Sequence, residues 1–273
     1  MYGELHQSLT EGQRDEYLKF IGMEAPQKAD LEYLDRLVFA HQCTVPFENL
    51  NPMAARPVEL GTEALFNKII KGGRGGFCFE LNGLFCRLLE ACGYDAYGCR
   101  ARVVRDKDFI PPCLHRGTLV RLDDGLYYVD VGYGGPQPGG ALKVEDGFER
   151  TVCGQTFRVT EYDSDWWMFS KESGGRFAGI IQFTLMKEDE SEYLPGCYYC
   201  ATNRDSVFVQ KYMLNRRLKD GSVSVVGDSY KRITDGVRIE KKIAAPGMLA
   251  EIAETEFGIR GAGRLICRDQ EGV

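Results

Sequence analysis

The spacing of apolar residues changes once along this chain, near residue 95, and that change limits the folds open to it. Before residue 95, apolar residues recur three and four positions apart, which is typical of core-facing helices. One such stripe consists of Leu81, Leu84, Phe85, Leu88, Leu89 and Cys92. After residue 95, apolar runs follow a period of two and are separated by turns rich in Gly, Asp and Pro. Helices followed by a series of strands predict an α+β fold, because a Rossmann-type fold would alternate the two.

Capping signals and apolar runs place the expected elements along the chain. Thr10 with Gln13, and Asp30, are helix N-cap signals, and two more helices are expected to begin near Thr62 and at Cys78. Strands are expected at 96–104, 114–122, 126–131, 157–162, 166–169, 180–185, 223–226 and 230–233, and a last helix at about 246–257. No internal repeat or low-complexity linker interrupts them, so we expect tightly packed subdomains.

Composition argues against several classes of partner. The chain has 273 residues, 44% of them hydrophobic, which is enough to bury a core without metals or disulfides. Its net charge is −6 and its basic residues are scattered, so we expect neither a nucleic-acid partner nor a membrane-surface patch. The first fourteen residues are polar and no apolar run approaches membrane-spanning length. We therefore expect a soluble, cytoplasmic protein.

The ten cysteines are irregularly spaced and are expected to be reduced thiols. Cys197 and Cys200 form the one suggestive pair, CYYC. A metal or redox role would need a second ligand pair or a strand-to-helix context, and neither is evident. We interpret this pair as strand packing and expect no metal.

The segment RGGFCFELN, residues 74–82, places Cys78 at a predicted helix N-terminus. Unpaired backbone N–H groups and the helix dipole favour a thiolate there, and the same N–H groups can receive an oxyanion. The alternative interpretation is a small buried apolar residue at a helix start. Cys78 is thus a candidate nucleophile that needs a base.

Three histidines compete for the role of base. His6 lies in a polar terminal segment, and His41 lies late in a predicted helix, where it can cap carbonyl groups. His115 begins an apolar strand, where an imidazole has no packing reason to be. The alternative for His115 is a satisfied core histidine.

Asp130 interrupts the next apolar strand, where a lone carboxylate is costly to bury. If the hairpin loop spans residues 122–125, Arg121 faces Leu126, and Asp130 then lies diagonal to His115 on one face. A slip of one residue would place them on opposite faces. We therefore predict a triad in which Cys78 is the nucleophile, His115 its base through either ring nitrogen, and Asp130 the group that fixes the tautomer. We expect the first two to rest as a thiolate–imidazolium pair.

These residues carry a resemblance to a known family. Cys78, His115 and Asp130, in this order and at these separations, resemble the triad of the arylamine N-acetyltransferases. Three segments are similar to motifs of that family: VPFENL at 45–50, RGGFCFELN at 74–82 and VDVGYGG at 129–135, in which tyrosine replaces phenylalanine. YLKFIG at 17–22 also fits, so the similarity extends over about half the chain.

The resemblance implies an architecture and an activity. It implies a helical subdomain at 1–94 carrying the nucleophile, a β-barrel-like subdomain at 95–200 carrying the histidine and aspartate, and an α/β lid subdomain at 201–273. Their core would be like that of a cysteine protease. It further implies ping-pong acetyl transfer from acetyl-CoA to arylamines, arylhydrazines or arylhydroxylamines through an S-acetyl-cysteine, with no metal.

Further site residues follow from the resemblance by position. Phe47, Val103 and Tyr133 match the acceptor pocket and Gly134 a position near the acyl group, with core packing as the alternative. The segment that meets CoA in the family departs here, since its proline and early asparagine are missing. Thr202, Ser206 and Phe208 can still be aligned with it.

Charged residues and rival functions complete the predictions. Arg204, Lys211, Arg216 and Arg217 can meet CoA phosphates, or form a solvated face. The resemblance also implies that Glu48 and Arg74 form a structural ion pair, and Arg is a usual partner for a buried carboxylate. Because the CoA segment is altered, an amide synthase of a polyketide pathway stays open as an alternative. A thiol hydrolase is the other, because a Cys-His-Asp triad does not by itself exclude water.

Overall fold

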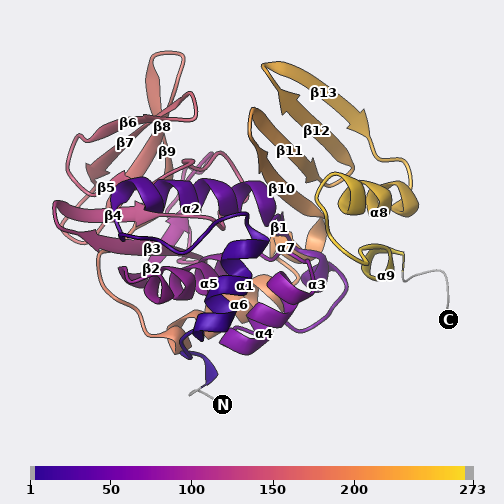
Figure 1. The fold of residues 1–273 in the computed structure, drawn as a ribbon. Helices are drawn as coiled ribbons and strands as arrows, with labels where there is room; N and C mark the ends of the chain where they lie inside the picture. Colours follow the sequence, from indigo (N-terminus) through magenta and orange to yellow (C-terminus); the bar gives the residue numbers. More distant parts are fainter. Residues whose placement is uncertain (1–3, 268–273) are drawn as a thin grey trace.

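The computed structural model describes residues 4–267 (Figure 1). Its first third is helical, with α1 (Glu11–Phe20), α2 (Leu31–Thr44), α3 (Leu50–Met53), α4 (Thr62–Phe66), the π-helical turn η2 (Asn67–Lys71) and α5 (Cys78–Ala91). The predicted caps are confirmed: Thr10 and Gln13 form a reciprocal capping box, and the Asp30 side chain accepts a hydrogen bond from the Tyr33 amide. Apolar side chains of these helices form the largest core cluster, in which α5 is almost wholly buried.

An eight-stranded antiparallel sheet follows, as the change in period predicts. It contains β2 (Asp95–Val103), β3 (His115–Leu122), β4 (Gly125–Val129), β5 (Leu142–Lys143), β6 (Glu149–Val152), β7 (Gln155–Glu161), β8 (Trp167–Ser173) and β9 (Arg176–Phe183). The strand order is β5-β4-β3-β2-β9-β8-β7-β6. Strand β5, at one end, contacts β7 near the other, so the sheet curls into a nearly closed barrel. Its interior is filled by residues such as Leu119, Phe157 and Phe169.

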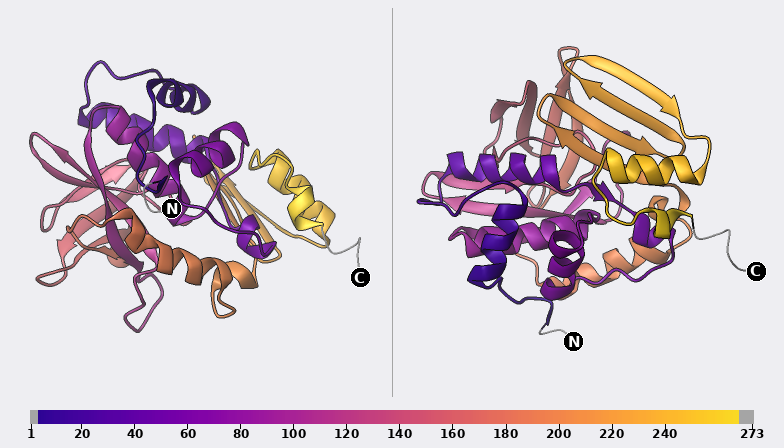
Figure 2. Two further views of the ribbon diagram at one scale, coloured as in Figure 1. Left: turned by 90° about the horizontal axis from the view of Figure 1, so that it is seen from below. Right: turned by 45° about the vertical axis from the view of Figure 1, so that its right-hand side comes forward.

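The last part combines short helices with a second sheet. It contains η3 (Glu190–Tyr193), α6 (Leu194–Thr202), α7 (Val207–Gln210), β10 (Met213–Leu218), β11 (Gly221–Val226), β12 (Ser229–Thr234), β13 (Val237–Lys242), α8 (Pro246–Thr255) and α9 (Gly263–Ile266). These four strands form a five-stranded antiparallel sheet with β1 (Phe47–Glu48), which comes from the helical part of the chain. The barrel-like sheet and the yellow C-terminal sheet lie on opposite sides of the molecule (Figures 1 and 2).

The α+β prediction with a barrel-like middle part is confirmed, and one local prediction is wrong. Cys197 and Cys200 lie on helix α6, not on a strand, and both are buried. Pro195 occupies the first turn of that helix, and Gly196 lets the Phe79 ring approach closely. The strands β1, β5, β6, β10 and β13 were not predicted. The division at residues 94 and 200 stays a prediction. Among the described residues, no helix is both long and apolar enough to cross a membrane.

Candidate active site

Cys78 is the first residue of α5, as predicted. The preceding turn is fixed by Glu80, whose carboxylate accepts a hydrogen bond from the Phe77 amide at 3.1 Å and pairs with Lys68 Nζ at 2.6 Å. The thiol is buried, with Sγ 3.7 Å from the carbonyl oxygen of Leu114, just before β3. The start of α5 therefore presents the sulfur to the strand that carries the candidate base.

The β3–β4 hairpin brings His115 and Asp130 together. Arg121 pairs with Leu126 in the predicted register, and the ladder extends to Thr118 opposite Val129. Beyond it, His115 Nε2 lies 2.6 Å from Asp130 Oδ2, and both side chains are buried. Because Nε2 is engaged by the carboxylate, Nδ1 is the nitrogen left for Cys78. The sequence left this choice of nitrogen open.

Asp130 is held by donors on both carboxylate oxygens. Oδ1 accepts hydrogen bonds from Asn82 Nδ2 at 3.0 Å and from the Gly132 amide at 2.9 Å. Oδ2 accepts a hydrogen bond from the Tyr128 hydroxyl at 2.8 Å, in addition to its contact with His115. Burial acts to raise the pKa of Asp130, but His115 and these donors outweigh it and hold the pKa below its ordinary value. The carboxylate therefore stays ionised.

Burial and neighbouring groups act in opposite directions on the Cys78–His115 pair, and the expected thiolate–imidazolium state stays a prediction. Burial raises the pKa of the Cys78 thiol, and the nearby imidazole of His115 only partly opposes this. Burial by itself lowers the pKa of His115, but Asp130 and Cys78 raise it to about 10. The aspartate thus favours an imidazolium, as expected, whereas the sulfur loses its proton less readily than a helix N-terminus alone would suggest.

The other two histidines lie away from this cluster. His6 is exposed and lines a separate cavity. His41 is fully buried between the rings of Tyr17 and Phe85. Neither of its ring nitrogens has a hydrogen-bond partner among the described residues, and burial lowers its pKa to about 3. His41 is therefore a neutral core residue rather than the helix-capping group that its position suggested.

Two of the predicted acceptor residues lie in direct contact with each other. A Cβ atom on Gly134 would lie 2.6 Å from the Phe47 ring, so only glycine allows this approach. Tyr133 lies edge-on to His115, with 6.2 Å between ring centroids. Val103 is half-buried and pairs with Ile181 of β9. Of these residues, the ring contact therefore places Tyr133 beside the triad.

The three residues aligned with the CoA segment differ in environment. Thr202 is exposed, and its hydroxyl donates to the Tyr198 carbonyl. Ser206 is buried, donates to the Cys200 carbonyl at 2.7 Å and caps α7. Phe208 packs on Phe77, the residue before Cys78, with 5.4 Å between ring centroids. Phe208 therefore approaches the start of α5, whereas Ser206 is committed to the local fold.

The four basic residues near this segment also differ in their environment, two being exposed and two making internal hydrogen bonds. Arg204 and Lys211 are exposed. The side chain of Arg216 donates to the Glu256 carbonyl, and that of Arg217 donates to Gln42 Oε1, both at 2.7 Å. Arg204 makes only a long, exposed ion pair with Asp205, 3.8 Å apart, so Arg204 and Lys211 are the two that are available to a phosphate.

The predicted ion pair between Glu48 and Arg74 is confirmed, with Arg74 Nη2 2.6 Å from Glu48 Oε1. The Glu48 side chain is wholly buried, and its Oε2 accepts a hydrogen bond from the Leu50 amide at 2.7 Å. This pair therefore fixes the segment around β1 against the turn that leads to Cys78.

Sequence reasoning missed two residues of the site, Asn82 and Tyr128. Asn82 lies one helical turn after Cys78, and Tyr128 lies two residues before Asp130 in the strand direction. Those spacings place Asn82 on the same helix face as Cys78 and Tyr128 on the same strand face as Asp130, which is the signal that could have found them. In RGGFCFELN the asparagine was treated only as part of a motif.

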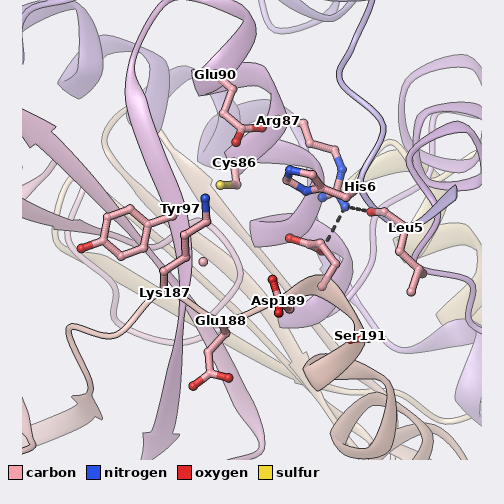
Figure 3. Close-up of a pocket in the computed structure, with 12 residues that line it drawn as sticks. Leu5, His6, Cys86, Arg87, Glu90, Tyr97, Lys187, Glu188, Asp189 and Ser191 are labelled. Carbon is pink, nitrogen blue, oxygen red and sulfur yellow. Dashed lines mark hydrogen bonds and ion pairs between the residues drawn. The ribbon is translucent and has the colours of Figure 1, made fainter. Parts of the chain in front are cut away.

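A cavity of about 260 Å³ lies apart from the triad, between α5, β2 and the segment before α6 (Figure 3). It is lined by residues that include His6, Cys86, Arg87 and Glu90. Beside it, Glu190 Oε2 lies 2.9 Å from Arg87 Nη2 and 2.7 Å from Arg116 Nη1. No cluster of three or more metal-ligating side chains occurs within residues 4–267.

A buried thiol at a helix N-terminus, near an imidazole that contacts a carboxylate, is the arrangement found in enzymes that use a cysteine for acyl transfer or hydrolysis. Comparison with known proteins specifies the class further. The sequence profile described as N-acetyltransferase matches residues 30–265. The arylamine N-acetyltransferase of Mycolicibacterium smegmatis is 33% identical over 199 residues, which cover 71% of this chain and 72% of that protein. The chain therefore belongs to the arylamine N-acetyltransferase family.

Solved structures agree with this assignment. The arylamine N-acetyltransferase of Salmonella typhimurium superposes with a TM-score of 0.87 and 25% identity, covering 92% of both chains. That of Mycobacterium marinum, solved in complex with CoA, superposes with a TM-score of 0.85 and 26% identity, covering 93% of this chain and 97% of the other.

Proposed function

We propose that this enzyme transfers an acetyl group from acetyl-CoA to an arylamine, arylhydrazine or arylhydroxylamine through an S-acetyl intermediate on Cys78. The observation that carries the proposal is the buried cluster of Cys78, His115 and Asp130, in which His115 Nε2 lies 2.6 Å from Asp130 Oδ2. Two relatives support the donor and acceptor classes: the Salmonella typhimurium protein is named an arylamine N-acetyltransferase, and the Mycobacterium marinum enzyme binds CoA.

In the first half-reaction the Cys78 sulfur attacks the thioester carbonyl of acetyl-CoA. His115 Nδ1 takes the thiol proton, the carbonyl carbon forms a bond to Sγ, and its bond to the CoA sulfur breaks. The proton then passes from His115 to the departing CoA thiolate. The backbone N–H of Cys78 at the start of α5, with the Val103 amide as a second donor, stabilises the oxyanion.

In the second half-reaction the amine nitrogen attacks the acetyl carbon and the bond to Sγ breaks. An aniline nitrogen is uncharged at neutral pH, so it needs only a base to remove its proton during attack, and His115 supplies that base. Aromatic side chains Phe47 and Tyr133, with Val103 and Gly134, form the proposed acceptor pocket. Thr202 and Phe208, with Arg204 and Lys211, form the proposed CoA contacts, and Ser206 orders this segment.

Intact-mass measurement tests the proposal. Incubation with acetyl-CoA should add one acetyl group, which should persist in buffer and disappear when aniline is added, with acetanilide formed in equal amount. Cys78→Ser should remain unlabelled, whereas Cys153→Ser, which removes an exposed thiol, should label as the unsubstituted enzyme does.

The other outcomes identify the rival functions. A label that decays rapidly without amine indicates a thiol hydrolase. No labelling from acetyl-CoA favours the amide synthase, whose acyl group arrives on another carrier. Labelling of Cys78→Ser to the same extent would reject Cys78 as the nucleophile.

A further inference from the structure

The Asp130 oxygen that contacts His115 also accepts a second strong hydrogen bond. His115 Nε2 lies 2.6 Å from Oδ2, and the Tyr128 hydroxyl lies 2.8 Å from the same atom. The remaining oxygen, Oδ1, is already occupied by Asn82 and the Gly132 amide. Tyr128 therefore competes directly with the imidazole for the negative charge of the carboxylate.

The phenol of Tyr128 is locked in place inside the barrel. Its ring stacks on Phe183 with 4.3 Å between centroids and lies 5.5 Å from that of Phe169. Burial, followed by the charge of Asp130, raises the pKa of Tyr128 well above its ordinary value. The hydroxyl consequently remains protonated, and towards Asp130 it can act only as a donor.

The neighbouring strand leaves room for this hydroxyl. A Cβ atom on Gly117 of β3 would lie 2.5 Å from Tyr128 Cε2 and 2.8 Å from its hydroxyl oxygen. Any other residue at position 117 would displace the ring from Asp130. The contact between Tyr128 and Asp130 therefore depends on Gly117 of β3 as well as on Tyr128 of β4.

We propose that Tyr128 is a positioning residue that moderates the pull of Asp130 on the His115 proton, so that His115 releases this proton at a lower pH than it would beside an unshared carboxylate and can act as a base towards the amine. A carboxylate that shares its charge with a phenol is a weaker acceptor for an imidazolium. This inference rests on the proposed function, because it concerns the half-reaction in which the amine attacks S-acetyl Cys78.

The charged and titratable groups around His115 determine which step can test the inference. Cys78 faces it from α5, Cys99 lies near Asp130 on β2, and Tyr133 follows β4 with Arg105 beside it. Once Cys78 carries an acetyl group it no longer titrates. Burial keeps Cys99 protonated by raising its pKa, so His115 controls the proton chemistry of the amine step.

The test is a single-turnover reaction of the isolated S-acetyl enzyme with aniline across a range of pH. The rate should rise with pH as His115 becomes neutral. In Tyr128→Phe the midpoint of this rise should move to higher pH by about one pH unit, the size of change that a lost charge-assisted hydrogen bond corresponds to. Tyr127→Phe is the matched control, because its hydroxyl contacts Asp124, 2.7 Å away in the hairpin turn. Its midpoint should not move.

A second readout keeps the inference testable if Tyr128→Phe is poorly stable. The chain has three histidines, so the ring protons of His115 can be assigned by NMR and titrated in both the variant and the unsubstituted enzyme. An unchanged His115 titration and an unchanged midpoint in folded Tyr128→Phe would overturn the inference. Failure of the enzyme to form or transfer the acetyl group would instead reject the proposed function.

Discussion

At the scale of single residues, the central question is the protonation state of Cys78 and of His115. Burial opposes ionisation of the thiol, whereas Asp130 favours the imidazolium. Both groups therefore hold their protons to higher pH than they would in water. The thiolate forms only when the pair loses one proton.

This state predicts a pH dependence for acetylation. Because the pKa of each partner is raised, the protonated pair prevails at low pH, and the rate of Cys78 acetylation by acetyl-CoA should climb from pH 6 towards pH 9. At the acid end the slope should be about tenfold per pH unit, as for the loss of one proton. Rapid-quench mass spectrometry measures it. A flat profile over this range would indicate a thiolate–imidazolium pair already formed at pH 6.

Replacement of Asn82 by alanine should damage the site, because its side chain orients Asp130. Its amide donates to Asp130 and to the Arg116 carbonyl at 2.6 Å, and its oxygen accepts from the Val131 amide at 2.8 Å. Asn82→Ala leaves buried groups unpaired, so unfolding free energy should fall by about 1–3 kcal/mol.

Acetyl transfer by Asn82→Ala should fall by about 10²-fold, because Asp130 and His115 lose their alignment. Steady-state kinetics and denaturant unfolding measure the two effects. Asn67→Ala, which removes an exposed contact to Glu63, should change neither. Full activity of Asn82→Ala would mean that the remaining donors suffice to orient Asp130.

At the scale of helices and strands, some local arrangements could be derived from the sequence and others could not. The hairpin register could be derived, because the turn and two otherwise unfavourable residues, His115 and Asp130, had a single consistent arrangement. The helical conformation of α6 could not be derived from the sequence. Tyr198 and Tyr199 favour a strand, and Pro195-Gly196 resembles a turn, yet the segment forms a helix whose buried face carries Cys197 and Cys200, three residues apart.

The C-terminal sheet shows the other limit of prediction. Strand β13 is exposed along its whole length, so it buries no apolar stripe from which a period could be recognised. Strand β10 contains Asn215, Arg216 and Arg217, which pair with distant partners that the sequence does not reveal. Its place beside β1 is set by tertiary contacts.

The turn of the β3–β4 hairpin provides a prediction about an element. Gly125 has a φ of 145°, a conformation that other residues rarely adopt. Gly125→Ala should therefore lower the unfolding free energy by about 1–3 kcal/mol. It should also reduce acetyl transfer, since this turn fixes the register that joins His115 to Asp130.

Denaturant unfolding and steady-state rates measure both quantities. Gly12→Ala is the control, because nothing lies near its added methyl group and it occupies a helix, where alanine is favoured. An unchanged stability of Gly125→Ala would show that the turn relaxes at no cost.

At the scale of the whole molecule, Glu190 connects segments that are far apart in sequence. It pairs with Arg87 of α5 and Arg116 of β3, and Arg87 also contacts the carbonyl of Leu5. Burial acts to raise the pKa of Glu190, but the two guanidinium groups outweigh it and lower the pKa. Its contribution to stability is therefore present at neutral pH and lost as the pH falls through the folded-state pKa.

Glu190→Gln should remove this contribution and leave two buried cations short of a partner. The expected cost is about 3–5 kcal/mol, with a fall in Tm on the order of 10 °C. The free energy of unfolding of Glu190→Gln should also fall less on acidification than that of the unsubstituted protein. Calorimetry at several pH values measures both effects.

Glu149→Gln is the matched control, because its partner Arg158 is substantially exposed and such pairs contribute at most about 1 kcal/mol. A Tm for Glu190→Gln equal to that of this control would show that the two arginines find other partners.

The pairing of β1 with β10 has a consequence for biosynthesis. Phe47 and Glu48 leave the ribosome long before Asn215 and Leu214, with which they pair, and the Glu48 amide also donates to the Gly76 carbonyl in the turn before Cys78. The hydrogen bonds of this two-residue edge are therefore completed only once β10 has been synthesised. A polypeptide that stops before residue 213 would carry Cys78, His115 and Asp130 yet lack the strand that pairs with β1, so we expect such a fragment to be inactive.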